Sequence, residues 1–179
     1  MRETGRQLGQ EVERISRPIS TKNPDKPKIR YSLVSRRFNS RWDTEKIMAM
    51  LEKRMTPEMV ARYRKYVSAP LECPVMSLLV NGDIALMGMP GEPFVDFAVD
   101  FRSRAPARNA FFVGYANGYA GYFPTITAAV SGGYGADSLG ARAEIGAGET
   151  MVDTAIVELF RLRGQTPTLP RELTFNPSN

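Results

Sequence analysis

The chain contains no histidine among its 179 residues. Histidine is the usual general base near neutral pH and the commonest metal ligand in proteins. Its absence excludes a catalytic or zinc site that depends on an imidazole from this chain alone. The single cysteine, Cys73, excludes an intrachain disulfide and leaves the redox compartment open.

Long apolar runs are also missing. No stretch of about 18 apolar residues exists, so the sequence predicts no transmembrane helix. The N-terminal stretch is polar and has no apolar signal core, so no secretory leader is predicted in the chain as given. With 42% hydrophobic and 24% charged residues, the composition is typical of a globular protein. The length suits one domain or a large piece of one.

The charge is unevenly distributed. Residues 1–70 hold 17 Lys and Arg against 8 Asp and Glu, while residues 71–179 hold 7 against 11. The first part has a net charge of +9 and the second of −4. Such asymmetry can mark a contact with an anionic surface or nucleic acid. The basic residues form no tight run, so a solvated face is favoured and no nucleic-acid partner is expected.

The first half of the chain contains three predicted segments. Residues 2–15 are predicted as a short amphipathic helix, followed by a Pro-rich loop. Residues 29–35 alternate between apolar and polar side chains, as in a strand. Residues 43–68 are predicted as two helices or one broken helix, because Thr56-Pro57 is a typical helix start. The apolar stripe of the first helix comprises Leu8, Val12 and Ile15.

A β-hairpin is the clearest element of the second half. Asn81-Gly82 separates two apolar β-type runs, and both turn residues tolerate positive φ. The second arm is almost wholly apolar, which predicts a strand buried on both faces. A helix is then predicted to open at Pro93, another buried strand over residues 110–117, and a last helix over residues 144–162. The predicted inner stripe of the Pro93 helix comprises Phe94, Val95, Phe97, Ala98 and Phe101.

These elements together predict a mixed α/β (α+β) fold. A mixed sheet with a central hairpin is expected, flanked by helices, as the C-terminal portion of a larger sheet or sandwich core. Residues 1–163 would form a single domain or the C-terminal portion of a larger catalytic domain. Residues 164–179, rich in proline, are expected to be a surface or disordered tail.

Glu92 occupies an unusual setting. It lies between Pro90-Gly91 and Pro93, at the junction of a predicted buried strand and a helix. Ligands bind at such strand ends in helix-flanked sheets, and the two prolines restrict the backbone. The alternative is that Glu92 only stabilises the helix N-terminus through the helix dipole.

A second candidate stretch is the tyrosine-rich segment of residues 115–125. It also follows a predicted strand, so it could converge with Glu92 on one site, or it could be a packed turn with hydrogen-bonded phenols. The Gly-rich segment 131–135 lacks the Lys-Ser/Thr ending of a phosphate-binding loop, which favours a connecting loop or a lid. Glu149 is expected to be a solvated residue of the last helix.

Three motifs together carry a family resemblance. In this order and spacing, "GDIALMGMPGEPF", "NGYAGYFPT" and "AGETMVDTAIVELF" resemble the closing part of the neutral/alkaline (non-lysosomal) ceramidase family, most closely its bacterial ceramidase-like members. The resemblance extends from about Leu71 to Leu162. The earlier residues contain no specific motif.

The resemblance implies a zinc amidohydrolase that cleaves the amide bond of N-acyl sphingosines or related N-acyl compounds. In that family two histidines, one glutamate and one tyrosine hold the metal. The matching positions here are Glu92, in the Pro-Gly-Glu motif, and Tyr122, in the aromatic loop. Gly91, Tyr119, Thr125 and Tyr134 are further candidates for lining the site.

The chain departs from the family in length and ligands. Members are more than twice as long, and their zinc histidines and nucleophilic serine precede the matching region. We therefore expect no amidase activity and weak or absent zinc binding from this chain alone. The expected partner is a complementing N-terminal chain or segment. In isolation an uncovered sheet edge or face should drive homo-oligomerisation.

We call the pair Glu92 and Tyr122, two of the four metal ligands, a half-site. Two alternatives to it remain at this point. One is a non-catalytic association module of ceramidase-like descent, and the other is an anionic-surface binder that uses the basic N-terminal third. The compartment stays open, since members of the resembled family are often secreted.

Overall fold

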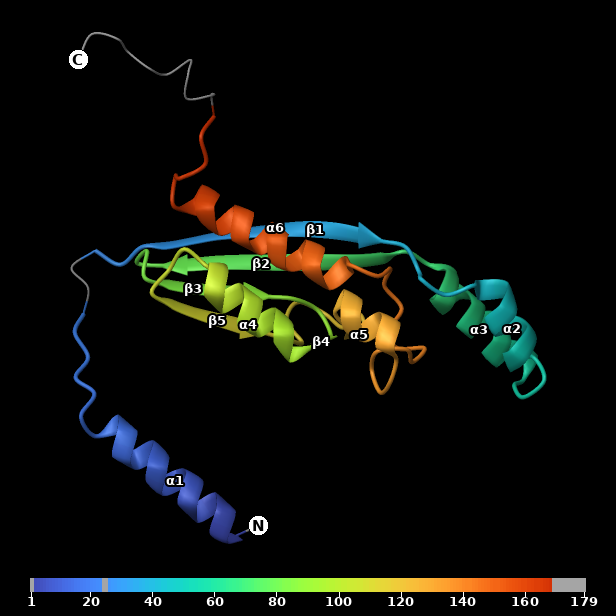
Figure 1. The fold of residues 1–179 in the computed structure, drawn as a ribbon, viewed down its shortest axis with the longest axis horizontal. Coiled ribbons are helices and arrows are strands. Elements are labelled where there is room, and N and C mark those ends of the chain that lie inside the picture. The colour runs from blue at the N-terminus through green and yellow to red at the C-terminus, as the bar shows by residue number, and fades with distance from the viewer. Residues whose placement is uncertain (1, 24–25, 169–179) are drawn as a thin grey trace.

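A four-stranded mixed sheet forms the centre of the computed structural model, which describes residues 2–23 and 26–168 (Figure 1). The strand order is β1-β2-β3-β5. The pairs β1–β2 and β2–β3 are antiparallel, and the pair β3–β5 is parallel. The mixed α/β class, the central hairpin and the flanking helices are confirmed. The bounds are β1 (Ile29–Phe38), β2 (Leu71–Val80), β3 (Ile84–Gly88) and β5 (Asn109–Val113).

The β2–β3 hairpin turns where the sequence predicts. Asn81 has φ 52° and Gly82 has φ 80°, a left-handed conformation that these residue types accept more readily than others. Lys28 donates its backbone N–H to Asn81 Oδ1 at 2.8 Å and so ties the entry of β1 to this turn.

The helices of the first half also follow their sequence signals. α1 (Arg2–Ser16) contains no buried residue and lies apart from the sheet (Figure 1). α2 (Thr44–Leu51) is capped by Asp43, which accepts from the Lys46 N–H, and α3 (Pro57–Ser68) is capped by Thr56. The alternative of two helices over residues 43–68 is therefore confirmed.

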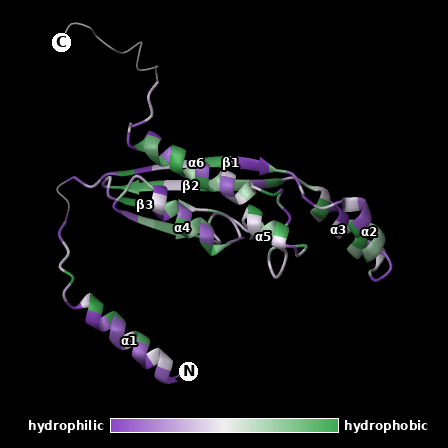
Figure 2. Cartoon of the chain, in the orientation of Figure 1, coloured by the Kyte–Doolittle hydropathy of each residue, from purple (hydrophilic) through white to green (hydrophobic). Residues whose placement is uncertain are grey.

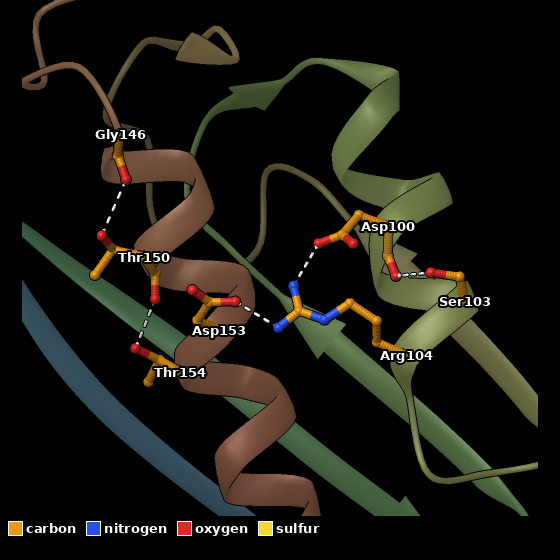
Figure 3. A network of polar contacts seen from close by, with 7 residues as sticks. All are labelled: Asp100, Ser103, Arg104, Gly146, Thr150, Asp153 and Thr154. Atoms are coloured by element: carbon orange, nitrogen blue, oxygen red, sulfur yellow. Dashed lines mark hydrogen bonds and ion pairs between the residues drawn. The ribbon is translucent and has the colours of Figure 1, made fainter.

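Two helices cover one face of the sheet. α4 (Val95–Arg104) and α6 (Ala147–Leu162) lie side by side on it (Figure 1). Figure 3 shows Arg104 between Asp100 of α4 and Asp153 of α6, with N–O distances of 2.7 and 2.5 Å. Because all three side chains are exposed, this pairing stabilises little, and apolar packing beneath it holds the layers together. The largest buried side chains there include Phe101, Met87, Met151 and Leu159.

α4 begins later than predicted. The prediction of a helix from Pro93 is wrong, because Glu92–Pro93 forms a short strand, β4, that pairs with β6 (Tyr122–Phe123). The helix starts at Val95, whose side chain is 73% exposed rather than part of an inner stripe. Phe97 and Phe101 are buried as predicted. α6 likewise begins at Ala147, three residues after the predicted start.

β3 and β5 are less buried than predicted. In β3, Ala85 and Met87 are buried while Ile84 and Leu86 are only half-buried, and β5 is an edge strand with Phe111 exposed. The reason is that, among the described residues, helices pack on one sheet face only. An apolar run therefore did not mean burial on both sides.

The remaining described segments are short. α5 (Ile126–Ser131) is capped by Thr125 at its start and by Gly132 at its end. No helix among the described residues is long and apolar enough to span a bilayer. Most of the predicted tail lies outside the described residues, which end at 168.

Candidate functional site

Glu92 and Tyr122 are direct neighbours on two short parallel strands. The register pairs Glu92 with Tyr122 and Pro93 with Phe123. The Glu92 N–H donates to the Gly121 carbonyl at 2.8 Å, and the Phe94 N–H donates to the Phe123 carbonyl at 3.0 Å. Register partners on adjacent strands lie about 4.8 Å apart and their side chains leave the same face. Both candidate ligands, Glu92 and Tyr122, therefore lie on the same side of this strand pair, which we call the rim; of the two alternatives that the sequence left open, this is the convergent one.

Glycines make this close pairing possible. Gly91 has φ +88°, and a Cβ there would lie 2.2 Å from the Gly121 carbonyl oxygen. Gly121 has φ +84°, and its Cβ would lie 2.0 Å from the Gly140 carbonyl oxygen. The Tyr122 N–H donates to that same Gly140 oxygen at 3.0 Å. Three backbone segments are thus layered at distances that only glycine permits.

Three phenols lie at the Glu92 carboxylate and a fourth, that of Tyr134, contacts one of them; we call these four side chains the tyrosine cluster. The Tyr119 hydroxyl donates to Glu92 Oε1 at 2.9 Å, and its ring stacks on Tyr115 with centroids 5.8 Å apart. The Tyr122 and Tyr134 hydroxyls lie 3.1 Å apart, with their rings edge to face. The cluster comprises Tyr115, Tyr119, Tyr122 and Tyr134.

The tyrosine cluster and the Glu92 carboxylate shift each other's pKa values. Partial removal from water alone would raise the pKa of Glu92, but the hydrogen bond from Tyr119, aided by the nearby phenols of Tyr115 and Tyr122, outweighs it and lowers this pKa. The pKa of Tyr122 is raised, first by its hydrogen bond with Tyr134 and then by the nearby Glu92 carboxylate. The carboxylate is therefore held ionised while the phenol keeps its proton.

The site is open to solvent. The side chains of Tyr115 and Tyr119 are 64% and 63% exposed, and that of Tyr134 is 89% exposed. Tyr134 reaches Tyr122 from the Gly-rich segment 131–135, in which three glycines have positive φ. This segment therefore contributes a phenol to the rim. An open rim can receive a ligand or a second chain.

The other predicted site residues have different roles. Gly91 contributes its backbone, and Tyr119 and Tyr134 belong to the cluster. Thr125 caps α5 by accepting from the Ala128 N–H at 3.1 Å, and no hydrogen bond among the described residues links it to the rim. Tyr115 was not among the predicted lining residues, although its place in the same tyrosine-rich segment could have indicated it.

Glu149 is not the solvated helix residue that the sequence suggested. Its Oε1 accepts from the Ile126 N–H at 2.8 Å, so it satisfies the start of α5 from α6. Its Oε2 is buried and has no hydrogen-bond partner among the described residues. The environment of Glu149 therefore depends on the contact between α6 and the start of α5.

The rim offers a limited set of metal donors. Glu92 supplies a carboxylate and Tyr122 a phenol, both oxygen ligands. Among the described residues no group of three or more His, Cys, Asp or Glu side chains could hold a metal ion. Structural zinc is usually bound by four ligands, and catalytic zinc by three protein ligands and a water. The two donors correspond to half of such a set.

Comparison with known proteins gives no match: neither a protein-family model, nor a curated protein, nor a solved structure is similar to this chain.

Proposed function

We propose that this chain is the C-terminal portion of a ceramidase-like zinc amidohydrolase and supplies two of the four metal ligands, Glu92 and Tyr122. The reaction would be hydrolysis of the amide bond of an N-acyl sphingosine or a related N-acyl compound. One observation carries the proposal: these two residues, thirty positions apart in sequence, are register partners on adjacent strands. The motifs that resemble the family contain both of them.

The rim fits half of a zinc site and no more. Glu92 is favoured in its ionised form, as a metal ligand must be. Tyr122 holds its proton through Tyr134 and the Glu92 charge, so binding a metal there requires that proton to leave. Since the chain has no histidine, the remaining ligands would come from a complementing chain or segment.

The residues present have distinct tasks in this proposal. When bound, zinc would polarise the scissile carbonyl and lower the pKa of a bound water toward about 7. Tyr119 holds the Glu92 carboxylate by its 2.9 Å hydrogen bond and so fixes its orientation. Gly91 and Gly121 let the two strands approach closely, so that Glu92 and Tyr122 are register partners.

The absence of histidine allows a direct test. Free imidazole can supply the nitrogen ligands that this chain lacks, and no protein histidine adds a background signal. We would titrate the untagged chain with Co²⁺, a spectroscopic substitute for Zn²⁺, with and without imidazole. We expect weak binding alone and an imidazole-dependent gain in affinity with the absorption of a tetrahedral site.

Matched variants assign the signal to the rim. Glu92→Gln and Tyr122→Phe should each abolish the imidazole-dependent gain, because each removes one donor. Tyr134→Phe should retain it, because Tyr134 touches Tyr122 without being a proposed ligand. A gain that survives in Glu92→Gln and Tyr122→Phe, or no gain in the unmodified chain, would refute the half-site.

A second candidate is a non-catalytic association module of ceramidase-like descent. The observation in its favour is the uncovered apolar face of the sheet, described below. It predicts no imidazole-dependent metal site, so the same titration separates it from the first. An anionic-surface function has no such support, because several basic side chains of the first third already pair with carboxylates, including Arg6, Arg14, Arg17 and Arg64.

A further inference from the structure

The side of the sheet away from α4 and α6 is apolar across all four strands. The register places Tyr31 beside Leu78, Leu78 beside Leu86, and Leu86 beside Phe111, in one row across the sheet. Tyr31 is 73% exposed and Phe111 is 52% exposed. We call this side the open face. Its apolar residues are Ile29, Tyr31, Leu33, Pro74, Met76, Leu78, Val80, Ile84, Leu86, Phe111 and Val113, and the register places Ser35, Arg37, Glu72, Gly88 and Asn109 on the same side.

Strand alternation separates the open face from the covered one. In β2, Val75 and Leu79 are buried beneath the helices. Met76 and Leu78 point to the opposite face and remain half-buried. In β1, Ser32 hydrogen-bonds to Glu158 of α6, which marks the covered side. Within the described residues, no helix packs on the opposite side.

The open face has little charge of its own. Its charged strand residues, Arg37 and Glu72, lie at one end and form an ion pair of 3.7 Å. No net charge therefore selects an oppositely charged partner. An identical face could pack against it without bringing like charges together.

The size of the open face suits a dimer. Strands spaced about 4.8 Å apart, two of ten residues and two of five at about 3.3 Å per residue, cover about 500 Å². Two such faces would bury about 1,000 Å², which reaches the usual lower bound for a specific interface. A patch of this extent is about as large as the largest apolar patch on a typical monomer, and such patches are often binding sites.

We propose that the open face is the interface with a second copy of this chain, so that two sheets stack face to face in a homodimer. Sheets pack this way at about 10 Å with their strands roughly aligned. A two-fold axis makes the contact self-complementary, since each copy offers the same patch. This inference goes beyond the proposed function and holds whether or not the rim binds a metal.

Within the chain itself, the helix α1 is the competing occupant. Its apolar side chains Leu8, Val12 and Ile15 are exposed, but the rest of the helix is polar (Figure 2). A helix about 10 Å across would cover about two of the four strands. A second sheet covers all four, and this favours the second copy.

Sedimentation equilibrium or light scattering on the full chain tests the proposal. We expect dimers at about 100 µM and dissociation on dilution. Leu78→Lys and Phe111→Lys place an unpaired charge at the centre of the interface in both copies, so each should weaken dimerisation at least about 100-fold. Val99→Lys is the matched control, because Val99 is 62% exposed on the helical side, and it should dimerise like the unmodified chain.

Circular dichroism would establish that each variant is folded, and Tyr31→Lys provides a third, more exposed position. A monomer at every concentration would overturn the proposal. So would dimers that resist all three open-face variants, since the contact would then lie elsewhere. A variant without residues 2–19 should still dimerise, and loss of the dimer on that deletion alone would assign the interface to α1 instead.

Discussion

The backbone contact beneath Glu92 leads to a sharp prediction about Gly91. Replacing Gly91 by alanine would place a Cβ 2.2 Å from the Gly121 carbonyl oxygen. Cβ contacts below 3.0 Å essentially never occur, so one segment would have to move by at least 0.8 Å, from 2.2 to 3.0 Å. The Glu92 N–H bond to Gly121 lies next to this contact and would be distorted.

The expected loss of stability has three parts. An alanine held at φ +88° costs about 1–2 kcal/mol relative to glycine. Forcing extra volume into a tight contact adds about 1–3 kcal/mol, and the disturbed hydrogen bond adds about 1 kcal/mol. We therefore expect Gly91→Ala to destabilise by about 3–6 kcal/mol.

Gly82→Ala is the matched control. Gly82 has φ +80°, almost the same as Gly91, but nothing lies within 4 Å of its would-be Cβ. Only the conformational part should remain, about 1–2 kcal/mol. Urea unfolding monitored by circular dichroism would measure both variants. Equal losses for Gly91→Ala and Gly82→Ala would refute the close contact between the two site-bearing strands.

Three other predictions concern titration, reactivity and packing. The folded-state pKa of Glu92 is below its ordinary 4.5, so the carboxylate stabilises the fold above that pH and loses this effect as the pH falls. In thermal unfolding, Glu92→Gln should therefore be less stable than the unmodified chain at pH 7, and the difference should shrink toward pH 3. Burial, and then the charge of Glu72, raises the pKa of Cys73 to about 11, so thiol reagents at pH 8 should react slowly with the folded chain and rapidly in urea; fast labelling of the folded chain would contradict its burial. Phe101→Ala should destabilise by about 3–5 kcal/mol in chemical unfolding, while Val99→Ala on the exposed side of α4 should change little.

Local signals in the sequence predicted the elements whose geometry depends on a few neighbouring residues. Asn81-Gly82 accept positive φ, and Thr56-Pro57 provide both a cap and a preset first helical turn, so the hairpin and α3 formed where expected. The resemblance in the motifs also selected Glu92 and Tyr122 as a pair. Each of these inferences needed only short-range chemistry or a matching pattern.

Tertiary pairing decided the rest. Pro93 carries a helix-start signal, yet Glu92–Pro93 extends as a strand because Tyr122–Phe123 lies beside it. An apolar run such as Ile84–Gly88 does not reveal whether one or two layers cover it, since that depends on where distant helices pack. Residues thirty positions apart meet at the rim only because Gly91, Gly121 and Gly140 let three backbone segments approach, and such contacts between distant segments leave no periodicity in the sequence.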